Sequence, residues 1–442
     1  MRICFLGAGS TVFAKNVLGD CIRTPELGKF EIALHDIDAT RLDESFAVIS
    51  AINNNYGKPA TIYKFLDRRE ALKGADYIIN AVQVGGYIPC TVTDFEIPKK
   101  YGLRQTIADT LGIGGIFRAL RTIAVLEDFA KDIEELCPDA LFLNYTNPMA
   151  MLTGYLLTYT KVKAVGLCHS VQSCVPWLLF NAGLSKQKKT CAYSIGGINH
   201  QAWLLDIKDK DGNDLYPTIK ERSLKKGRRN ALGGVIPDVV RHDIMKHFGC
   251  YVTESSEHNS EYMPYYIKAR RPDLIKHFRI PLDEYPRRCV RQIKLWKFRR
   301  FTLMFRKKLK HFKSHEYGSY IIGAAYSGKP FNFNGSILNT GYRIPNLPEY
   351  ACVEIPMTVK DNGFDAPAFR RLPEELAALN RTNINVQTLT LLAAKERRMD
   401  YLYMAAALDP HTSSELPVDK IIALCDELYE EHHKGGWLPE YK

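Results

Sequence analysis

The sequence has little that would direct the chain into a membrane or an oxidising compartment. Over its 442 residues, no apolar run approaches the roughly 20 residues of a transmembrane helix, which argues against a membrane span. The eleven cysteines are an odd number and lack the regular spacing of a disulfide framework, so we expect reduced thiols, most of them in the core. A signal peptide is also lacking, because a folding motif begins at once in "MRICFLGAGS". We therefore expect a soluble, cytoplasmic protein with no membrane partner.

Long low-complexity segments are lacking too, and hydrophobic residues make up 46% of the chain, enough for a complete core. A chain of this length is better accommodated by two domains than by one. We expect an NAD-binding domain over residues 1–165, and a domain for metal, substrate and oligomerisation over residues 166–442. Helical patterns near the C-terminus favour a homodimer or homotetramer.

The formal net charge of +11 raises the question of an acidic partner. Residues 294–313, "KLWKFRRFTLMFRKKLKHFK", interleave Trp296, Phe298, Phe305 and Phe312 with lysines and arginines. Such a mixture occurs in segments that bind nucleic acid or a membrane surface. We favour an amphipathic surface helix whose aromatic side chains pack inward, because no nucleic-acid-binding module accompanies the run. We thus expect no nucleic-acid partner.

The N-terminus has the pattern of a dinucleotide-binding unit. A short apolar strand leads into "GAGST", in which Gly7 and Gly9 allow a tight turn and a close backbone approach to a pyrophosphate. Val12 stands where the third glycine of the usual fingerprint would be, so the motif alone is weak. A second strand ends at Asp36, whose carboxylate suits the ribose hydroxyls of NAD and would repel a 2′-phosphate. The predicted cofactor contacts in this region are Gly7, Gly9, Ser10, Thr11 and Asp36.

Later strand patterns extend this unit. "ADYIINAVQVGG" and "DALFLNYTNP" read as further strands between helices, which predicts an α/β fold with a parallel Rossmann-type sheet followed by a mixed α+β part. The turn at Gly85 and Gly86 should border the cofactor at the carboxyl ends of the strands, and we add Gln83 and Val84 to its contacts. Asn147 follows another strand, where its side chain can donate and accept at once, which suits a polyol or an amide; alternatively it satisfies the backbone of a turn.

Cys168 and His200 suggest a metal site. Cys168 ends the apolar strand in "AVGLCHSVQSC", and His200 follows "SIGGIN" about thirty residues later. One thiolate and one imidazole are too few ligands for a closed zinc site. They fit a divalent ion such as manganese that also accepts oxygen atoms from a substrate. The alternative is an inert core thiol and a hydrogen-bonded loop histidine.

Several motifs resemble glycoside hydrolase family 4, the glycosidases that depend on NAD and manganese. They are "GAGST", "QVGGY", "DTLGIGGIFRALRT", "NYTNPMA", "GLCHSVQ", "GINH", "YVTESSEHNSEYMPYY", "DEYPRRC" and "ALNRTNINVQ". The resemblance covers nearly the whole chain and implies a plan like that of the lactate and malate dehydrogenases. "CHSVQ" and "ESSEHN" are most similar to the α-galactosidase branch, although branches that act on uronic acids also have Cys-His.

The resemblance also implies roles for individual residues. It makes Cys168 and His200 the metal ligands and Tyr262 the base, with Tyr265 and Tyr266 close enough in sequence to be alternatives. His169 stands where several members of the family have an aspartate proposed as the general acid, so the identity of the acid stays open. The implied substrate contacts are Asn147, Asp109 and Arg287.

The implied activity is hydrolysis of small α-galactosides of the melibiose type. The route runs through oxidation at C3 of the sugar, deprotonation at C2, elimination and addition of water, with NAD and Mn²⁺ as cofactors. An α-galacturonidase or α-glucosidase of the same family is an alternative. A second is an NAD-dependent 2-hydroxy-acid dehydrogenase, which needs a His–Asp pair and an arginine but no metal cysteine. A third is a non-catalytic NAD-sensing protein that binds nucleic acid.

Overall fold

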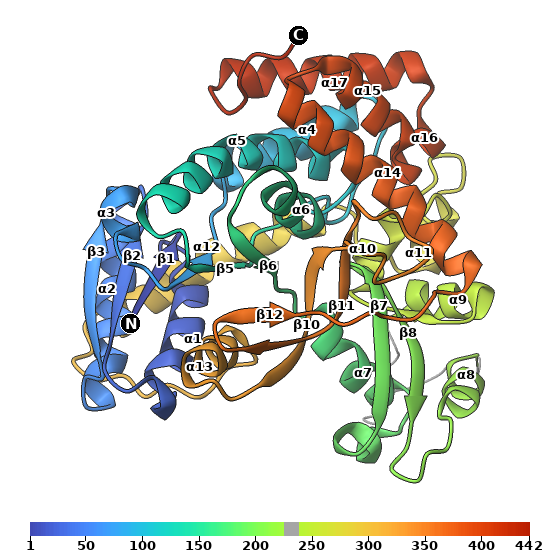
Figure 1. The fold of residues 1–442 in the computed structure, drawn as a ribbon. Helices are drawn as coiled ribbons and strands as arrows, with labels where there is room; N and C mark the ends of the chain where they lie inside the picture. The colour runs from blue at the N-terminus through green and yellow to red at the C-terminus, as the bar shows by residue number, and fades with distance from the viewer. Residues whose placement is uncertain (225–237) are drawn as a thin grey trace.

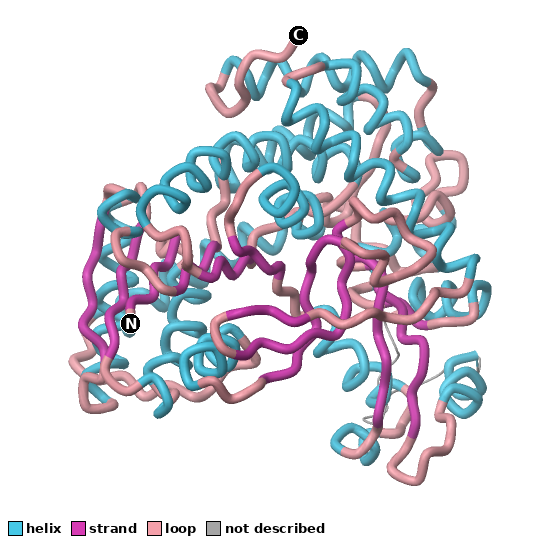
Figure 2. Tube along the Cα trace, viewed as in Figure 1, coloured by secondary structure: helices cyan, strands magenta, loops and turns pink. Residues whose placement is uncertain are grey.

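A mixed β-sheet forms the centre of the protein (Figures 1 and 2). The computed structural model describes residues 1–224 and 238–442, and over these residues the strands form one sheet of twelve. Its first part is parallel, with the strand order β3-β2-β1-β4-β5-β6 of a Rossmann fold. These strands are β1 (Arg2–Leu6), β2 (Phe30–His35), β3 (Ala60–Phe65), β4 (Tyr77–Asn80), β5 (Leu141–Asn144) and β6 (Lys163–Gly166).

Helices cover both faces of the parallel part, which explains why its central strands are apolar along their whole length. One face packs against α1 (Thr11–Ile22), α2 (Ala39–Asn55) and α13 (Gly318–Ser327). The other packs against α3 (Arg68–Leu72), α4 (Val92–Lys100), α5 (Gly112–Leu136), α6 (Met149–Tyr159) and C-terminal helices. The latter are α14 (Glu374–Glu396), α15 (Met399–Leu408), α16 (Pro410–Glu415) and α17 (Val418–Lys434).

The sheet continues without a break into an antiparallel part. Ser336 of β10 (Phe331–Leu338) pairs with Gly166 of β6. The order then runs through β11 (Cys352–Lys360), β7 (Ala192–Ile198), β8 (Gln201–Lys208) and β9 (Tyr251–Val252), while β12 (Gly363–Asp365) pairs with β11. The predicted fold class is confirmed. The domain division at residues 165 and 166 stays a prediction, since β6 itself ends at Gly166.

The remaining helical elements connect and flank these strands. They are η1 (Pro25–Leu27), η2 (Gly86–Thr91), η3 (Ser185–Lys189), α7 (Ser170–Asn181), α8 (Tyr216–Leu224), α9 (Val239–Phe248), α10 (Ser256–Glu261), α11 (Asp273–His277) and α12 (Glu284–Met304).

The basic segment forms the second half of α12 and the chain that follows it, but the inward packing predicted for its aromatic residues is wrong for most of them. Trp296 does turn inward, and its Nε1 donates to Glu44 Oε2 of α2 at 2.7 Å. Phe298, Phe305 and Phe312 are 78%, 80% and 71% exposed. In this half of α12, Trp296, Arg300 and Leu303 face α2 and the core beside it, and the helical period turns Phe298 away from them.

All eleven cysteines are free thiols, and seven of them are buried, in line with the prediction from their spacing. Within residues 1–224 and 238–442, no helix combines the length and the apolar character needed to cross a bilayer.

Candidate active site

The turn between β1 and α1 is shaped for a close approach of backbone and ligand. Gly7 has φ +84°, and a Cβ atom there would lie 2.8 Å from the carbonyl carbon of Ala81. The amide of Gly9 donates to Asp36 Oδ2 at 2.6 Å, and a Cβ on Gly9 would lie 2.7 Å from the same oxygen. Within the described part of the chain, no side chain caps the first turn of α1, so its N–H groups are available to an anion. The turn fits a dinucleotide pyrophosphate, with Asp36 beside it.

The other predicted cofactor contacts lie around the same rim, because β1 and β4 are neighbours and end together. Ser10 and Gln83 are exposed there. Thr11 is buried and its Oγ1 is 2.8 Å from Ser45 Oγ, so its hydroxyl holds α1 against α2. The carbonyl of Val84 accepts from Arg121 Nε at 3.3 Å, which fixes the loop after β4.

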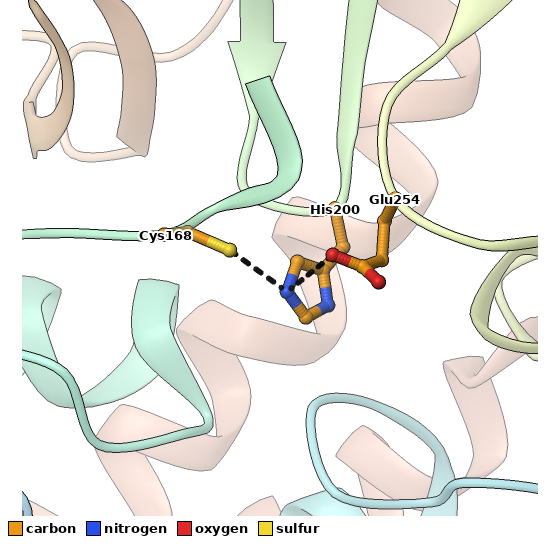
Figure 3. A group of neighbouring side chains, drawn as sticks. All are labelled: Cys168, His200 and Glu254. Carbon is orange, nitrogen blue, oxygen red and sulfur yellow. Dashed lines mark hydrogen bonds and ion pairs between the residues drawn. The ribbon is translucent and has the colours of Figure 1, made fainter. Parts of the chain in front are cut away.

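Three potential ligand atoms meet beyond the end of β6. Cys168 follows β6, His200 lies in the turn between β7 and β8, and Glu254 follows β9. Cys168 Sγ is 3.3 Å from His200 Nε2, which is 3.6 Å from Glu254 Oε2. The three side chains point toward one another (Figure 3), and their ligand atoms lie within 4.8 Å of each other. The structure thus joins the two predicted ligands to a carboxylate that the sequence analysis missed.

The backbone at two of these ligands is strained. His200 and Glu254 both have φ +66°, a conformation that non-glycine residues rarely adopt. Each such residue is held at a cost of about 1–3 kcal/mol by its surroundings, and strain of this kind is concentrated at functional sites. The folded chain therefore fixes both side chains in place.

The carboxylates beside the cluster each lie close to a histidine side chain. Burial raises the pKa of Asp109, but the hydrogen bond from His258 and the nearby charges of His258 and Arg118 bring it down to about 2. His258 lies between two carboxylates, with Nε2 3.5 Å from Asp109 Oδ1 and Nδ1 3.5 Å from Glu254 Oε1. His200 and His258 outweigh the burial of Glu254 and lower its pKa. Both carboxylates are thus anionic at neutral pH.

The thiol differs from its neighbours. Burial, with the charges of Glu254 and Glu354, raises the pKa of Cys168 to about 12. A thiol of this kind becomes a metal ligand by losing its proton as the ion binds. On the other side of the ring, His200 Nδ1 is 3.4 Å from Thr110 Oγ1, a contact that orients the imidazole toward the cluster.

The two predicted catalytic residues flank the cluster. The imidazole of His169, next to Cys168, is half exposed, and its Nε2 is 2.7 Å from Glu316 Oε2. Burial lowers the pKa of His169, but the hydrogen bond and charge of Glu316 raise it above the ordinary value. The ring of Tyr262 is buried 6.3 Å from the ring of His200. Burial raises the pKa of Tyr262 well above the ordinary value, although a hydrogen bond with Thr110 opposes the rise.

The neighbouring tyrosines lie elsewhere. Tyr265 stacks against Phe248, and Tyr266 packs edge-on against Phe278. Of the three tyrosines considered from the sequence, Tyr262 is the one that the structure brings beside His200.

The structure brings two of the three predicted substrate residues to the cluster. Asn147 Nδ2 donates to Asp109 Oδ2 at 3.3 Å, so their side chains form one polar surface. Arg287 does not join them, because it lies in the first turn of α12, where its Nη2 binds Glu284 at 2.9 Å. The arginine at the cluster is Arg118, whose Nε donates to the carbonyl of Asn147 at 3.2 Å.

Sequence reasoning missed Arg118, Glu254 and Glu316. Glu254 carried a usable signal, because it is the first acidic residue after the strand β9, where polar side chains collect at a sheet edge. Arg118 lies within a helical pattern, and Glu316 meets His169 across 147 residues of sequence, so no local pattern marks either of them.

Comparison with known proteins identifies the family. The sequence profile described as "Family 4 glycosyl hydrolase" matches residues 2–180, and that of the "Family 4 glycosyl hydrolase C-terminal domain" matches residues 195–412. The chain belongs to family 4 of the glycosyl hydrolases. The resemblance seen in the motifs is thereby confirmed, and both halves of this family 4 chain are covered.

Named relatives give the family assignment more detail. An α-galactosidase from Bacillus subtilis (strain 168) is 55% identical over 442 residues, which are 100% of both chains. An α-galactosidase from Rhizobium meliloti (strain 1021) is 34% identical over 455 residues, covering 100% of this chain and 89% of the relative. A solved 6-phospho-α-glucosidase from gut microorganisms, in complex with NAD and Mn²⁺, has a TM-score of 0.81 at 20% identity. The alignment covers 100% of this chain and 99% of that one, so the two share the family 4 fold.

Proposed function

We propose that this family 4 enzyme is an α-galactosidase that uses NAD and Mn²⁺. The observation that carries the proposal is the cluster of Cys168, His200 and Glu254 at the carboxyl edge of the parallel sheet. The dinucleotide turn at Gly7 and Gly9 ends a strand at the same edge, where ligands of such sheets bind. The substrate class rests on the two α-galactosidases to which the whole chain is similar.

The donor set fits manganese. Cys168, His200 and Glu254 would hold a divalent ion through one thiolate, one imidazole and one carboxylate, a set small enough to admit oxygen ligands from a substrate. When bound, NAD supplies reversible oxidation at C3 of the sugar, and the metal supplies Lewis-acid stabilisation of negative charge beside it. Such chemistry would be redox-neutral overall, so no net NADH would accumulate.

The chain's own residues then handle protons and orientation. We assign Tyr262 to remove the C2 proton, a role in which a cation at the cluster would oppose the burial that raises the pKa of its phenol. We assign His169 to protonate the departing glycosidic oxygen. Asn147, Asp109 and Arg118 form the polar surface that would bind the sugar hydroxyls.

A 2-hydroxy-acid dehydrogenase is the second candidate, because His258 and Asp109 form a His–Asp pair and Arg118 lies close to it. That function leaves Cys168, His200 and Glu254 without a role, as does a nucleic-acid-binding function. A dehydrogenase would also form NADH in net amounts, whereas the proposed glycosidase would not.

The test is hydrolysis of the nitrophenyl α-galactoside, α-glucoside and α-galacturonide with NAD, Mn²⁺ and a thiol, omitting each in turn. Cleavage of the galactoside that requires both NAD and Mn²⁺ is expected. Cleavage of only the glucoside or the uronide would contradict the proposed substrate, and cleavage without NAD would contradict the proposed chemistry. Cys191 lies outside the cluster, so Cys191→Ser serves as the control for substitution of the cluster thiol Cys168.

Assembly and location are proposed alongside this activity. A homodimer or homotetramer is supported by the exposed apolar side chains of α12, which a second subunit could cover. A cytoplasmic location is supported by the free state of all eleven cysteines.

A further inference from the structure

The imidazole of His169 is held by a glutamate from a distant part of the chain. Glu316 lies just before α13, and its Oε2 is 2.7 Å from His169 Nε2. The two partners differ in exposure, since the side chain of Glu316 is 10% exposed and that of His169 is 46% exposed. An exposed imidazole needs no partner for its solvation, whereas a buried carboxylate does. Glu316 is therefore the buried, fixed partner of the pair, and the imidazole of His169 is the partner that solvent reaches.

The N-terminal approach to Glu316 is anchored on α1. Ser314 Oγ accepts a hydrogen bond from the amide of Glu316 at 3.1 Å. The amide of Ser314 donates to both carboxylate oxygens of Asp20, at 3.0 and 3.2 Å. Asp20 Oδ1 is also 2.7 Å from His311 Nε2, and both of these side chains are buried. These contacts dock residues 311–316 on the helix that follows the dinucleotide turn.

The chain beyond Glu316 is anchored on the strand end that carries His169. Tyr317 Oη accepts from the amide of Cys168 at 2.9 Å and donates to its carbonyl at 3.1 Å. The amide of Gly318 donates to Tyr145 Oη at 3.0 Å. Glu316 is thus fixed on both sides relative to the backbone of Cys168 and His169.

We infer that Glu316 positions His169 for proton transfer to the leaving group, an inference that rests on the proposed role of His169 as the acid. With Nε2–H donated to Glu316, Nδ1 is the ring nitrogen that can exchange a proton with substrate. Among the described residues, none is placed to occupy Nδ1 with a hydrogen bond. The carboxylate thereby selects both the tautomer and the direction of the ring.

The proton movements balance without further reactants. The Nδ1 proton of the imidazolium moves to the glycosidic oxygen as the bond from C1 to that oxygen breaks. The electron pair left at C2 when Tyr262 removes its proton forms the C1–C2 double bond. The oxygen keeps the electron pair of the bond, and the aglycone leaves as a neutral alcohol. His169 is left as the neutral Nε2–H tautomer, still donating to Glu316, which remains a carboxylate throughout. When water adds, Nδ1 takes a proton from it and the imidazolium is restored.

The test compares Glu316→Gln with the wild type on galactosides whose leaving groups differ in acidity. Dinitrophenolate departs without protonation, whereas the alkoxide of methyl α-galactoside or melibiose does not. We expect kcat to fall by on the order of 100-fold on methyl α-galactoside and melibiose, but by less than about threefold on the dinitrophenyl substrate. Glu316→Asp, which keeps the charge on a shorter side chain, should recover part of the loss. His315→Gln, an exposed neighbour in the same segment, is the matched control and should behave as wild type on all three substrates.

The variant His169→Gln distinguishes a failure of the positioning role of Glu316 from a failure of the proposed acid role of His169. If His169→Gln shows the leaving-group dependence and Glu316→Gln does not, the positioning role is wrong while the acid role stands. If neither variant shows it, the acid role itself is wrong. A loss of equal size on all substrates in both Glu316 variants would also overturn the inference, because it would reflect general disruption of the site. The double variant should lose no more than His169→Gln alone.

Discussion

Replacing Glu254 by glutamine is expected to weaken manganese binding by about 10- to 100-fold, which corresponds to about 1.4–2.7 kcal/mol. Glutamine keeps the size of the side chain and one oxygen at the cluster but removes its charge. At about 4 Å and an effective dielectric constant of about 20, two unit charges interact by about 4 kcal/mol, and the double charge of Mn²⁺ raises this to about 8 kcal/mol; the dehydration of ion and ligand cancels most of it. The lowered pKa of Glu254, which His200 and His258 bring about against its burial, means that the full charge is present at pH 7.

Titration of the free-ion EPR signal of Mn²⁺ measures this affinity without any substrate. Glu257→Gln is the matched control, since Glu257 lies three residues further on and faces Arg288 at 3.6 Å instead of the cluster. The control should bind Mn²⁺ as the wild type does. A Kd for Glu254→Gln within about twofold of the wild type would refute Glu254 as a ligand, since less than 0.5 kcal/mol would then be attributable to its charge.

Three further substitutions test other parts of the structure. Cys168→Ser should lower activity by at least about 100-fold and abolish Mn²⁺ binding measured by EPR. Changing even the hydrogen-bond partners of metal ligands lowers metal affinity or activity by about 10- to 100-fold, and here a ligand itself is changed. Full activity would contradict a thiolate ligand. Gly9→Ala should weaken NAD binding by about tenfold in a fluorescence titration, since its Cβ would lie 2.7 Å from Asp36 Oδ2. Asp20→Asn should lower the free energy of unfolding by about 3 kcal/mol at pH 7 in urea, by breaking the buried pair with His311. Although burial raises the pKa of Asp20, its hydrogen bonds with His311 and Ser314 bring that pKa below the ordinary 3.8. The difference should therefore persist above that pH and shrink as the pH falls below it, and a difference independent of pH would contradict an ionised Asp20 carboxylate.

Local patterns were sufficient to predict the turn between β1 and α1 and the strands around it. The glycines at positions 7 and 9 are required by close approaches to Ala81 after β4 and to Asp36 after β2, but the tight turn that they form is visible in the sequence as Gly-x-Gly directly after an apolar strand. The central strands of the parallel part, β1, β4 and β5, are apolar runs buried on both faces, and they could be recognised in the same way. Cys168 and His200 each follow a glycine-containing apolar segment, which marked both as candidates.

The contacts made by individual side chains account for the site and surface residues that the sequence analysis missed or misplaced. Glu254 reaches the cluster because β9 pairs with β8, which is a tertiary fact. Arg287 was chosen for its position in a motif, but the nearby carboxylate of Glu284 satisfies it on the surface of α12. The aromatic residues of α12 were expected inside because they are apolar, yet the line of contact with α2 is narrow and leaves Phe298 in solvent. The deciding contact comes from a paired strand for Glu254, and from a carboxylate three residues earlier in the same helix for Arg287; for Phe298 the outcome depends on the face of α12 that it occupies.

The central claim is that the C2 proton of the sugar leaves and returns during hydrolysis that is redox-neutral overall. The most direct measurement is NMR of the galactose released from an α-galactoside in D₂O, with absorbance at 340 nm followed in parallel. The account predicts deuterium at C2 of the product, no accumulation of NADH, and loss of both hydrolysis and labelling in Tyr262→Phe. Galactose that is released with its C2 hydrogen intact would contradict the account, because it would mean that the glycosidic bond is broken without deprotonation at C2.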